Sequence, residues 1–268
     1  MKQFLIAFGT FGFLATVTAA PASAQSYTGV PLHVNRTYPA YKACFFDLHP
    51  ELTKEQFDEF AGEVGAILRF RQLGETPTLG KGRFDVGVQY TTTPINDQKG
   101  AWNNTFSHPN ADHPLGDSIT FPRIVARYGV SDRVDVGGWG TKAPGANYGV
   151  VGFDTKVALV RQDAKHPVSV SIRPSIGALV GPSELFASAV SVDVSVGRTF
   201  GAWSTHVGLA ATAAAAMEMS NEVDLGTATG GDAAAFAGVS YGWRLLRFSV
   251  EVEKGDLFSY GFRIGTRF

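Results

Sequence analysis

The sequence contains very little cysteine, no excess of basic residues and no long apolar run beyond its first segment. Because Cys44 is the only cysteine, a disulfide within the chain is excluded, and we expect its thiol to pack as a small hydrophobic group rather than to react. A transmembrane helix needs about 20 consecutive apolar residues, so helical membrane spanning is excluded as well. The formal net charge of −1 gives no field for collecting nucleic acid, and we expect no nucleic-acid partner.

The first residues have the pattern of an export signal. Lys2 supplies the positive start, Phe4 to Val17 an apolar run, and Ala22-Ser23-Ala24 a small-residue cleavage site. We therefore expect a signal peptide over residues 1–24 that is removed on export. The residue that follows is Gln25 rather than a cysteine, so a lipid anchor is not expected.

From Val64 to the C-terminus, side-chain character alternates with a period of two, which is the pattern of β-strands. Runs of about ten residues match tilted membrane-spanning strands. One face of these runs is apolar, and the other is rich in glycine and serine with isolated arginine and aspartate, which suits an enclosed lumen better than bulk water. We predict an all-β fold over residues 63–268: a transmembrane, up-and-down, antiparallel β-barrel.

The number of strands stays open at this point. We count about eleven convincing runs, whereas bacterial single-chain barrels have even numbers. The preferred count is about twelve, with a further strand around Tyr27 to Asn35, and the alternative is about ten, with Val64 to Leu73 inside or beneath the barrel. A change of parity around Pro122 predicts a β-bulge in one strand.

Connections between the runs predict the orientation. Short turns fall on the side of the C-terminus, and the longer connections, such as residues 94–117 and 213–230, fall on the other side. Long loops outside and short turns inside are typical of outer-membrane barrels, so we expect the C-terminus in the periplasm.

Residues 25–62 are expected to form a leader before the barrel, with one short amphipathic helix. Thr53 and Gln56 stand at capping-box spacing, and apolar residues follow at helical intervals, which predicts a helix from about Lys54 to Ala61. We expect this helix to pack as a lid on the end of the barrel. A plug or a periplasmic docking element is the alternative.

The cleavable signal, the alternating strands and the ending Tyr260-Gly-Phe-Arg-Ile-Gly-Thr-Arg-Phe268 resemble Gram-negative outer-membrane β-barrel proteins of the porin-like and transporter-like kind. The run from Arg127 to Val136 is similar to their periplasmic hairpins. The resemblance implies location in the bacterial outer membrane, with lipid and the barrel assembly machinery as partners. It also implies that Tyr260, Phe262 and Phe268 form the assembly signal.

Motifs that suggest chemistry have simpler explanations. Gly238-Val-Ser-Tyr-Gly242 matches the G-x-S-x-G pattern of hydrolases, but it lies along an alternating strand rather than at a strand-to-helix elbow. His108, Asp112 and His113 share a long loop without completing a tetrahedral ligand set. We expect no catalytic residues, no enzymatic activity, no metal and no cofactor, and a membrane-embedded hydrolase using Ser240 and His206 is the least favoured function.

The inward face carries the charges that suggest a function. We predict a passive channel or uptake protein for small solutes, because rings of charge on a pore wall set selectivity. The alternative is a structural or interaction barrel, in which ion pairs between strands close the lumen. The solute and the oligomeric state are not indicated. The predicted lumen residues are Arg69, Arg71, Arg83, Asp85, Arg127, Arg133, Asp135, Asp154, Arg173, Asp193, Arg247, Glu251, Arg263 and Arg267.

Overall fold

The computed structural model describes residues 32–34, 40–110 and 112–268. The expected signal peptide and most of the expected strand at Tyr27 to Asn35 lie outside these residues. Ahead of the barrel strands come β1 (Phe45–Phe46) and helix α1 (Lys54–Leu68), and the first long loop contains helix α2 (Gly100–Asn103) and β3 (Phe106–Ser107), which pairs with β1. The barrel strands are β2 (Phe84–Pro94), β4 (Ser118–Gly129), β5 (Val134–Lys142), β6 (Gly149–Val160), β7 (Ser169–Val180), β8 (Leu185–Phe200), β9 (Trp203–Glu218), β10 (Thr227–Trp243), β11 (Leu246–Lys254) and β12 (Phe258–Arg267).

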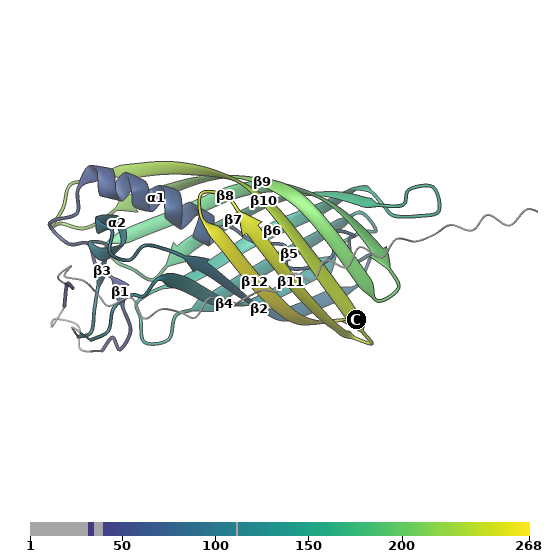
Figure 1. The fold of residues 1–268 in the computed structure, drawn as a ribbon, viewed down its shortest axis with the longest axis horizontal. Coiled ribbons are helices and arrows are strands. Elements are labelled where there is room, and N and C mark those ends of the chain that lie inside the picture. Colours follow the sequence, from purple (N-terminus) through teal and green to yellow (C-terminus); the bar gives the residue numbers. More distant parts are fainter. Residues whose placement is uncertain (1–31, 35–39, 111) are drawn as a thin grey trace, which may run out of the picture. The chain divides into compact units, whose positions relative to one another are not determined.

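These strands form one closed antiparallel barrel in the order β10-β11-β12-β2-β4-β5-β6-β7-β8-β9 (Figure 1). Closure is made by β12 and β2, whose ends are joined through the backbones of Phe84 and Phe268. The barrel has ten strands, so the ten-strand alternative is confirmed and the preferred count of about twelve is wrong. The first barrel strand begins at Phe84 rather than at residue 63, because residues 63–79 lie inside the barrel and a turn follows them.

The outer wall is apolar along the whole barrel. On β8, for example, Val190, Val192, Val194 and Val196 are exposed, and the residues between them are buried. On β12, Tyr260, Phe262 and Ile264 face outward in the same way. A closed barrel leaves no unpaired strand edge in lipid, and an apolar exterior suits the hydrocarbon core. The chain is therefore an outer-membrane β-barrel. None of the described helices is long and apolar enough to cross a membrane.

The two ends of the barrel differ as predicted. The turns between β4 and β5, β8 and β9, and β10 and β11 are short and lie at the end where the C-terminus is marked (Figure 1). The loop between β2 and β4, with α2 and β3, lies at the other end, which we take as the extracellular end. The connection expected over residues 213–230 is much shorter, because β9 continues to Glu218 and β10 starts at Thr227.

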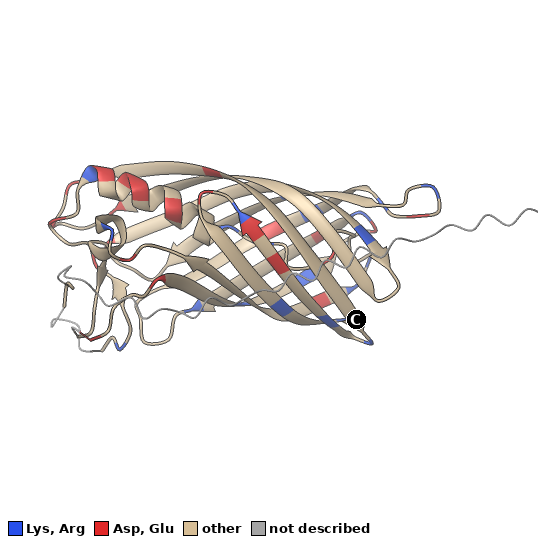
Figure 2. Ribbon diagram, viewed as in Figure 1, with Lys and Arg blue, Asp and Glu red and all other residues tan. Residues whose placement is uncertain are grey.

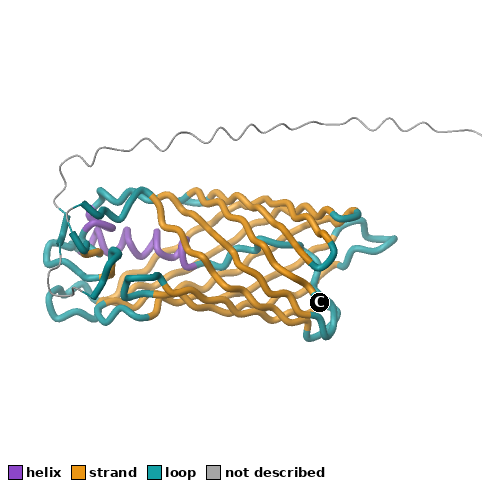
Figure 3. Tube along the Cα trace, turned by 90° about the horizontal axis from the view of Figure 1, so that it is seen from below, coloured by secondary structure: helices purple, strands orange, loops and turns teal. Residues whose placement is uncertain are grey.

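Helix α1 lies inside the barrel at the extracellular end (Figure 3). It starts as expected, since Thr53 and Gln56 form both hydrogen bonds of a capping box. It ends at Leu68 instead of Ala61, and the expected lid on the barrel end is wrong. Small residues make room for the helix: a Cβ on Gly65 would lie in contact with the Cβ of Ala214 on β9.

The interior of the barrel has an apolar zone around α1 and a charged zone beyond it. In the apolar zone, Phe57 and Phe60 of α1 belong to one buried cluster with Ile119 and Phe121 of β4. This zone explains the parity change at Pro122. The register of β2 and β4 is continuous there, so the predicted bulge is wrong, and the inner face of β4 simply changes from apolar to polar.

The occupied lumen as the candidate functional site

An extended segment, residues 69–79, runs from α1 through the charged zone and is here called the lumen segment. It begins where Arg69 ends the helix with ψ 140, an extended value. Leu73 has a φ of 35, in the left-handed region that bulky residues rarely adopt, and its side chain is fully buried. The segment therefore follows a path that its surroundings impose, not a path of local preference.

The upper part of the lumen segment is bound to β11. Arg69 and Arg71 both form ion pairs with Glu253, the Arg71 Nε lying 3.3 Å from Oε1. Arg71 Nη2 also donates to Ser259 Oγ at 2.7 Å. Glu251 accepts the backbone N–H of Leu73 at 3.1 Å. Because these groups are buried, removing one partner of such a pair costs about 3–5 kcal/mol.

The lower part of the segment is bound on both sides of the barrel. Glu75 receives Arg267 Nη1 at 2.7 Å and lies 3.4 Å from Arg247 Nε. Lys156 Nζ donates to the carbonyls of Glu75 and Pro77 at 3.1 and 2.7 Å. The carboxylate of Asp135 accepts the N–H of Leu79. The segment thus bridges β12 and β11 to β6 and β5.

The wall also forms ion pairs with itself, and some of the same groups contact the segment. Arg173 on β7 donates twice to Asp193 Oδ2 on β8, at 2.9 and 2.6 Å. The other wall pairs are Arg127–Asp154 at 2.6 Å, Lys156–Asp135 at 3.6 Å, Arg263–Asp85, Arg267–Asp85 at 3.4 Å and His206–Glu251 at 2.8 Å. The charged positions of the barrel strands in Figure 2 therefore belong largely to a network that joins strands next to each other or one strand apart.

The structure brings twelve of the fourteen predicted lumen residues into this interior. Ten of them lie on the wall, and Arg69 and Arg71 lie on the lumen segment rather than on a strand. The prediction is wrong for Arg83 and Arg133, which are exposed at the periplasmic end. Arg83 precedes β2, and Arg133 lies in the turn before β5. Tyr260 and Phe262 lie on the outer wall, and the ring of Phe268 stacks on Phe84 at 5.9 Å.

Sequence reasoning missed Arg123, which is 1% exposed and joins the two zones. Its guanidinium donates to the carbonyls of Ile67 and Arg69 at 2.8 and 3.1 Å and lies 4.5 Å from the ring centre of Trp139. It therefore caps the C-terminal end of α1, where the last carbonyls have no partner within the helix. Its parity with Phe121 was the signal available, and the bulge expected at Pro122 obscured it.

Little space remains between the lumen segment and the wall. A cavity of about 30 Å³ there is lined by Gln72, Arg127, Lys156 and other polar residues, which is enough for about two water molecules. A vestibule of about 430 Å³ opens at the periplasmic end and is bounded by Glu75, Pro77 and Thr78. In the described state, the lumen segment therefore separates this vestibule from the apolar zone.

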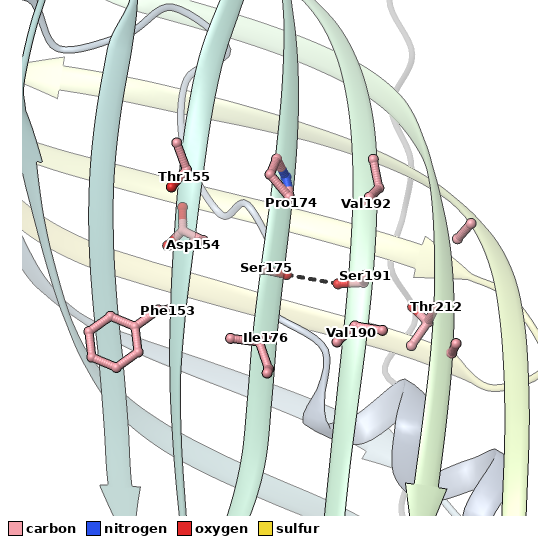
Figure 4. A pocket seen from close by; sticks show the side chains of 12 residues that line it. Phe153, Asp154, Thr155, Pro174, Ser175, Ile176, Val190, Ser191, Val192 and Thr212 are labelled. Carbon is pink, nitrogen blue, oxygen red and sulfur yellow. Dashed lines mark hydrogen bonds between the residues drawn. The ribbon is translucent and has the colours of Figure 1, made fainter.

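A larger groove, of about 620 Å³, lies on the wall across β6 to β9 (Figure 4). Its lining includes the exposed side chains of Phe153, Ile176, Val190 and Val192, beside the hydrogen-bonded pair Ser175 and Ser191. The groove is mostly apolar and lies on the outward, lipid-facing side of the wall.

The residues considered for hydrolysis and for metal binding are engaged elsewhere. Ser240 is buried and pairs with the hydroxyl of Ser249 at 2.8 Å, and His206 contacts Glu251. His108 lies 3.1 Å from the Cys44 Sγ and 2.9 Å from the His113 carbonyl oxygen. Burial lowers the pKa of His108 and raises the pKa of the Cys44 thiol to about 11.

No protein-family model matches the chain. No curated protein matches it in sequence. Among solved structures, an outer membrane channel from Pseudomonas putida F1 is 11% identical, with a TM-score of 0.41 over 73% of this chain and 98% of that one. Ail, the attachment invasion locus protein of Yersinia pestis, is 12% identical, with a TM-score of 0.32 over 70% and 99%. The N-terminal β-barrel domain of Pseudomonas aeruginosa OprF is 11% identical, with a TM-score of 0.32 over 70% and 99%. These likenesses are too weak to argue for a function, which has to come from the barrel itself.

Proposed function

We propose that this outer-membrane barrel is a channel for small solutes that its own α1 and lumen segment hold closed. The observation that carries the proposal is the set of ion pairs within the wall. If the charges of the wall served only to bind the lumen segment, they would pair with the segment and not with one another. Instead, four of the six wall carboxylates, Asp85, Asp135, Asp154 and Asp193, have an arginine or lysine partner elsewhere on the wall, so most of the wall charge stays paired when water replaces the segment.

The charge of that wall favours a weak selectivity. Seven cationic groups and six carboxylates line it, which is close to balance. Fixed charges of nearly equal number select weakly between anions and cations, with a small preference for anions. The set is Arg123, Arg127, Lys156, Arg173, Arg247, Arg263 and Arg267 against Asp85, Asp135, Asp154, Asp193, Glu251 and Glu253.

The test is conductance in planar bilayers, with two variants of equal chemistry. Glu253→Gln removes the carboxylate that both Arg69 and Arg71 contact, and it should raise the frequency of current steps above that of the wild type. Asp154→Asn is the control, since Asp154 is buried to the same degree, 4% exposed against 3%, but pairs with Arg127 on the wall. Equal currents from the two variants would contradict the proposal.

A second function is favoured by the apolar zone. Phe57 and Phe60 are completely buried against the wall, and water does not replace such contacts without cost. A barrel that is permanently filled would serve a structural or interaction role. Its signature is silence of the wild type and of Glu253→Gln across many insertions, together with a folded barrel for both.

A further inference from the structure

Three side chains that can ligate a metal converge near the start of α1, outside the barrel strands. They are His33, from the segment that pairs with His108, and His49 and Glu51, from the turn before α1. One ligand atom from each lies within 4.8 Å of the other two. The two imidazole rings are stacked, with centres 3.4 Å apart and 17° between their planes.

One nitrogen of each ring is already used. His33 Nε2 lies 2.9 Å from Asn104 Oδ1, so it carries the proton and leaves Nδ1 with its lone pair. His49 Nδ1 accepts the N–H of Glu51 at 3.3 Å, so this nitrogen has the lone pair and Nε2 carries the proton. In protein metal sites, a hydrogen bond on one ring nitrogen orients the other toward the ion. His33 has such a bond here, whereas His49 would bind through Nδ1, which now accepts the Glu51 N–H.

Carboxylates surround the two histidines. Burial and the neighbouring His33 lower the pKa of His49, and the carboxylates of Glu51, Asp47 and Glu222 act in the opposite direction. Glu222 comes from the loop between β9 and β10, far away in sequence. Two stacked imidazoles and several acids around them form a cluster that a bound divalent cation would neutralise.

We propose that His33, His49 and Glu51 form a binding site for a divalent transition-metal cation, with Zn²⁺ as the probe of choice. Imidazole nitrogen and carboxylate oxygen are ligands that zinc accepts at about 2.0–2.2 Å. Donors around such an ion lie closer together than 4.8 Å, and the stacked rings must turn so that both lone pairs meet. Metal binding therefore replaces the stack, and the hydrogen bond from the Glu51 N–H to His49, by coordination.

Two side chains connect the site to helix α1. Asn104, which orients His33, donates from Nδ2 to Gln56 Oε1 at 3.0 Å. The same oxygen accepts the N–H of Thr53 in the capping box of α1. A metal held here would fix the leader against the first turn of the helix. That consequence, closing the channel more firmly, rests on the proposed function, whereas metal binding does not.

The experiment is calorimetric titration of the folded mature chain, without a histidine tag, with ZnCl₂. We expect one site per chain in the wild type and about tenfold or greater weakening in His49→Ala and in Glu51→Gln. His166→Ala is the matched control, because His166 is exposed and pairs only with the nearby Asp163, and it should bind zinc as the wild type does. Circular dichroism checks that each variant is folded.

The absence of saturable heat in the wild type, or equal affinity in the wild type and His49→Ala, would overturn the site. The two proposals are separable, since zinc binding is read without any current. Zinc binding by a barrel that never conducts would leave the metal site standing while the channel fails. If both hold, zinc should lower the frequency of current steps in the wild type and leave that of His49→Ala unchanged.

Discussion

Adding one methyl group at Gly65 should displace helix α1, which fills the extracellular end of the barrel. A Cβ at this position would overlap the Cβ of Ala214 on β9, and the Ala214 Cα and the Thr212 methyl lie at 3.8 and 4.0 Å. None of these atoms is the end of a flexible side chain, so the strain cannot be relieved by a rotamer change. Gly65→Ala must shift the helix away from β9.

The same helix provides the control. A Cβ at Gly62 would meet nothing within 4 Å. Both substitutions gain about 1 kcal/mol of helix propensity, so this term cancels between them. Overpacking costs about 1–3 kcal/mol and applies at Gly65 alone. If opening requires α1 to leave this wall, the difference raises the open fraction by about 5- to 150-fold relative to Gly62→Ala.

The assay is single-channel recording of the two variants at equal protein in the same bilayers, with folding checked by resistance of the barrel to detergent without heating. Gly65→Ala should open more often and Gly62→Ala should match the wild type. An open fraction of Gly65→Ala no higher than that of Gly62→Ala would refute the contact between α1 and β9 as the closing element.

Further predictions concern the interior and the leader. Arg123→Ala leaves the carbonyls of Ile67 and Arg69 without their donor, so the free energy of unfolding should fall by about 1–3 kcal/mol per unsatisfied group in thermal unfolding. Arg133 is exposed, and Arg133→Ala should stay within about 0.5 kcal/mol of the wild type. Equal stability of the two variants would contradict the capping role of Arg123. Burial raises the pKa of Cys44 from 9.0 to about 11. Because the thiolate is the nucleophile, alkylation of Cys44 at pH 8 should be about a hundredfold slower in the folded chain than in the unfolded chain. Similar alkylation rates would mean that the leader is not packed around Cys44.

The alternation of side chains was sufficient to predict the barrel wall and most of the charges inside. It failed where the inner face of the barrel contacts apolar side chains instead of water. Around Phe121, the inner face of β4 is apolar because α1 and the leader pack against it. The apolar residues of β4 therefore change from one face to the other at Pro122, which led to the wrong prediction of a bulge there. Tyr148, which lies just before β6, also packs inside, on Phe46 at 5.0 Å between ring centres.

The lumen segment could not be distinguished from a strand by sequence. Residues 64–73 contain apolar side chains and two arginines at alternating positions, as the wall strands do. What distinguishes them is the partner: Arg69 and Arg71 meet Glu253, which lies more than 180 residues away along the chain. A pairing over that distance is set by the closed barrel and leaves no local signal.

The central claim, that the chain's own residues close the lumen, is tested most directly by a reversible cross-link. Thr76 of the lumen segment faces Gly197 on β8, where an added Cβ would lie 2.8 Å from the Thr76 Cβ, and a small outward shift gives the about 3.8 Å usual in disulfides. In a Cys44→Ser background, Thr76→Cys with Gly197→Cys should oxidise spontaneously, abolish current steps, and regain them on reduction. Failure to form the bond in the folded barrel, or steady current through the oxidised protein, would contradict the account.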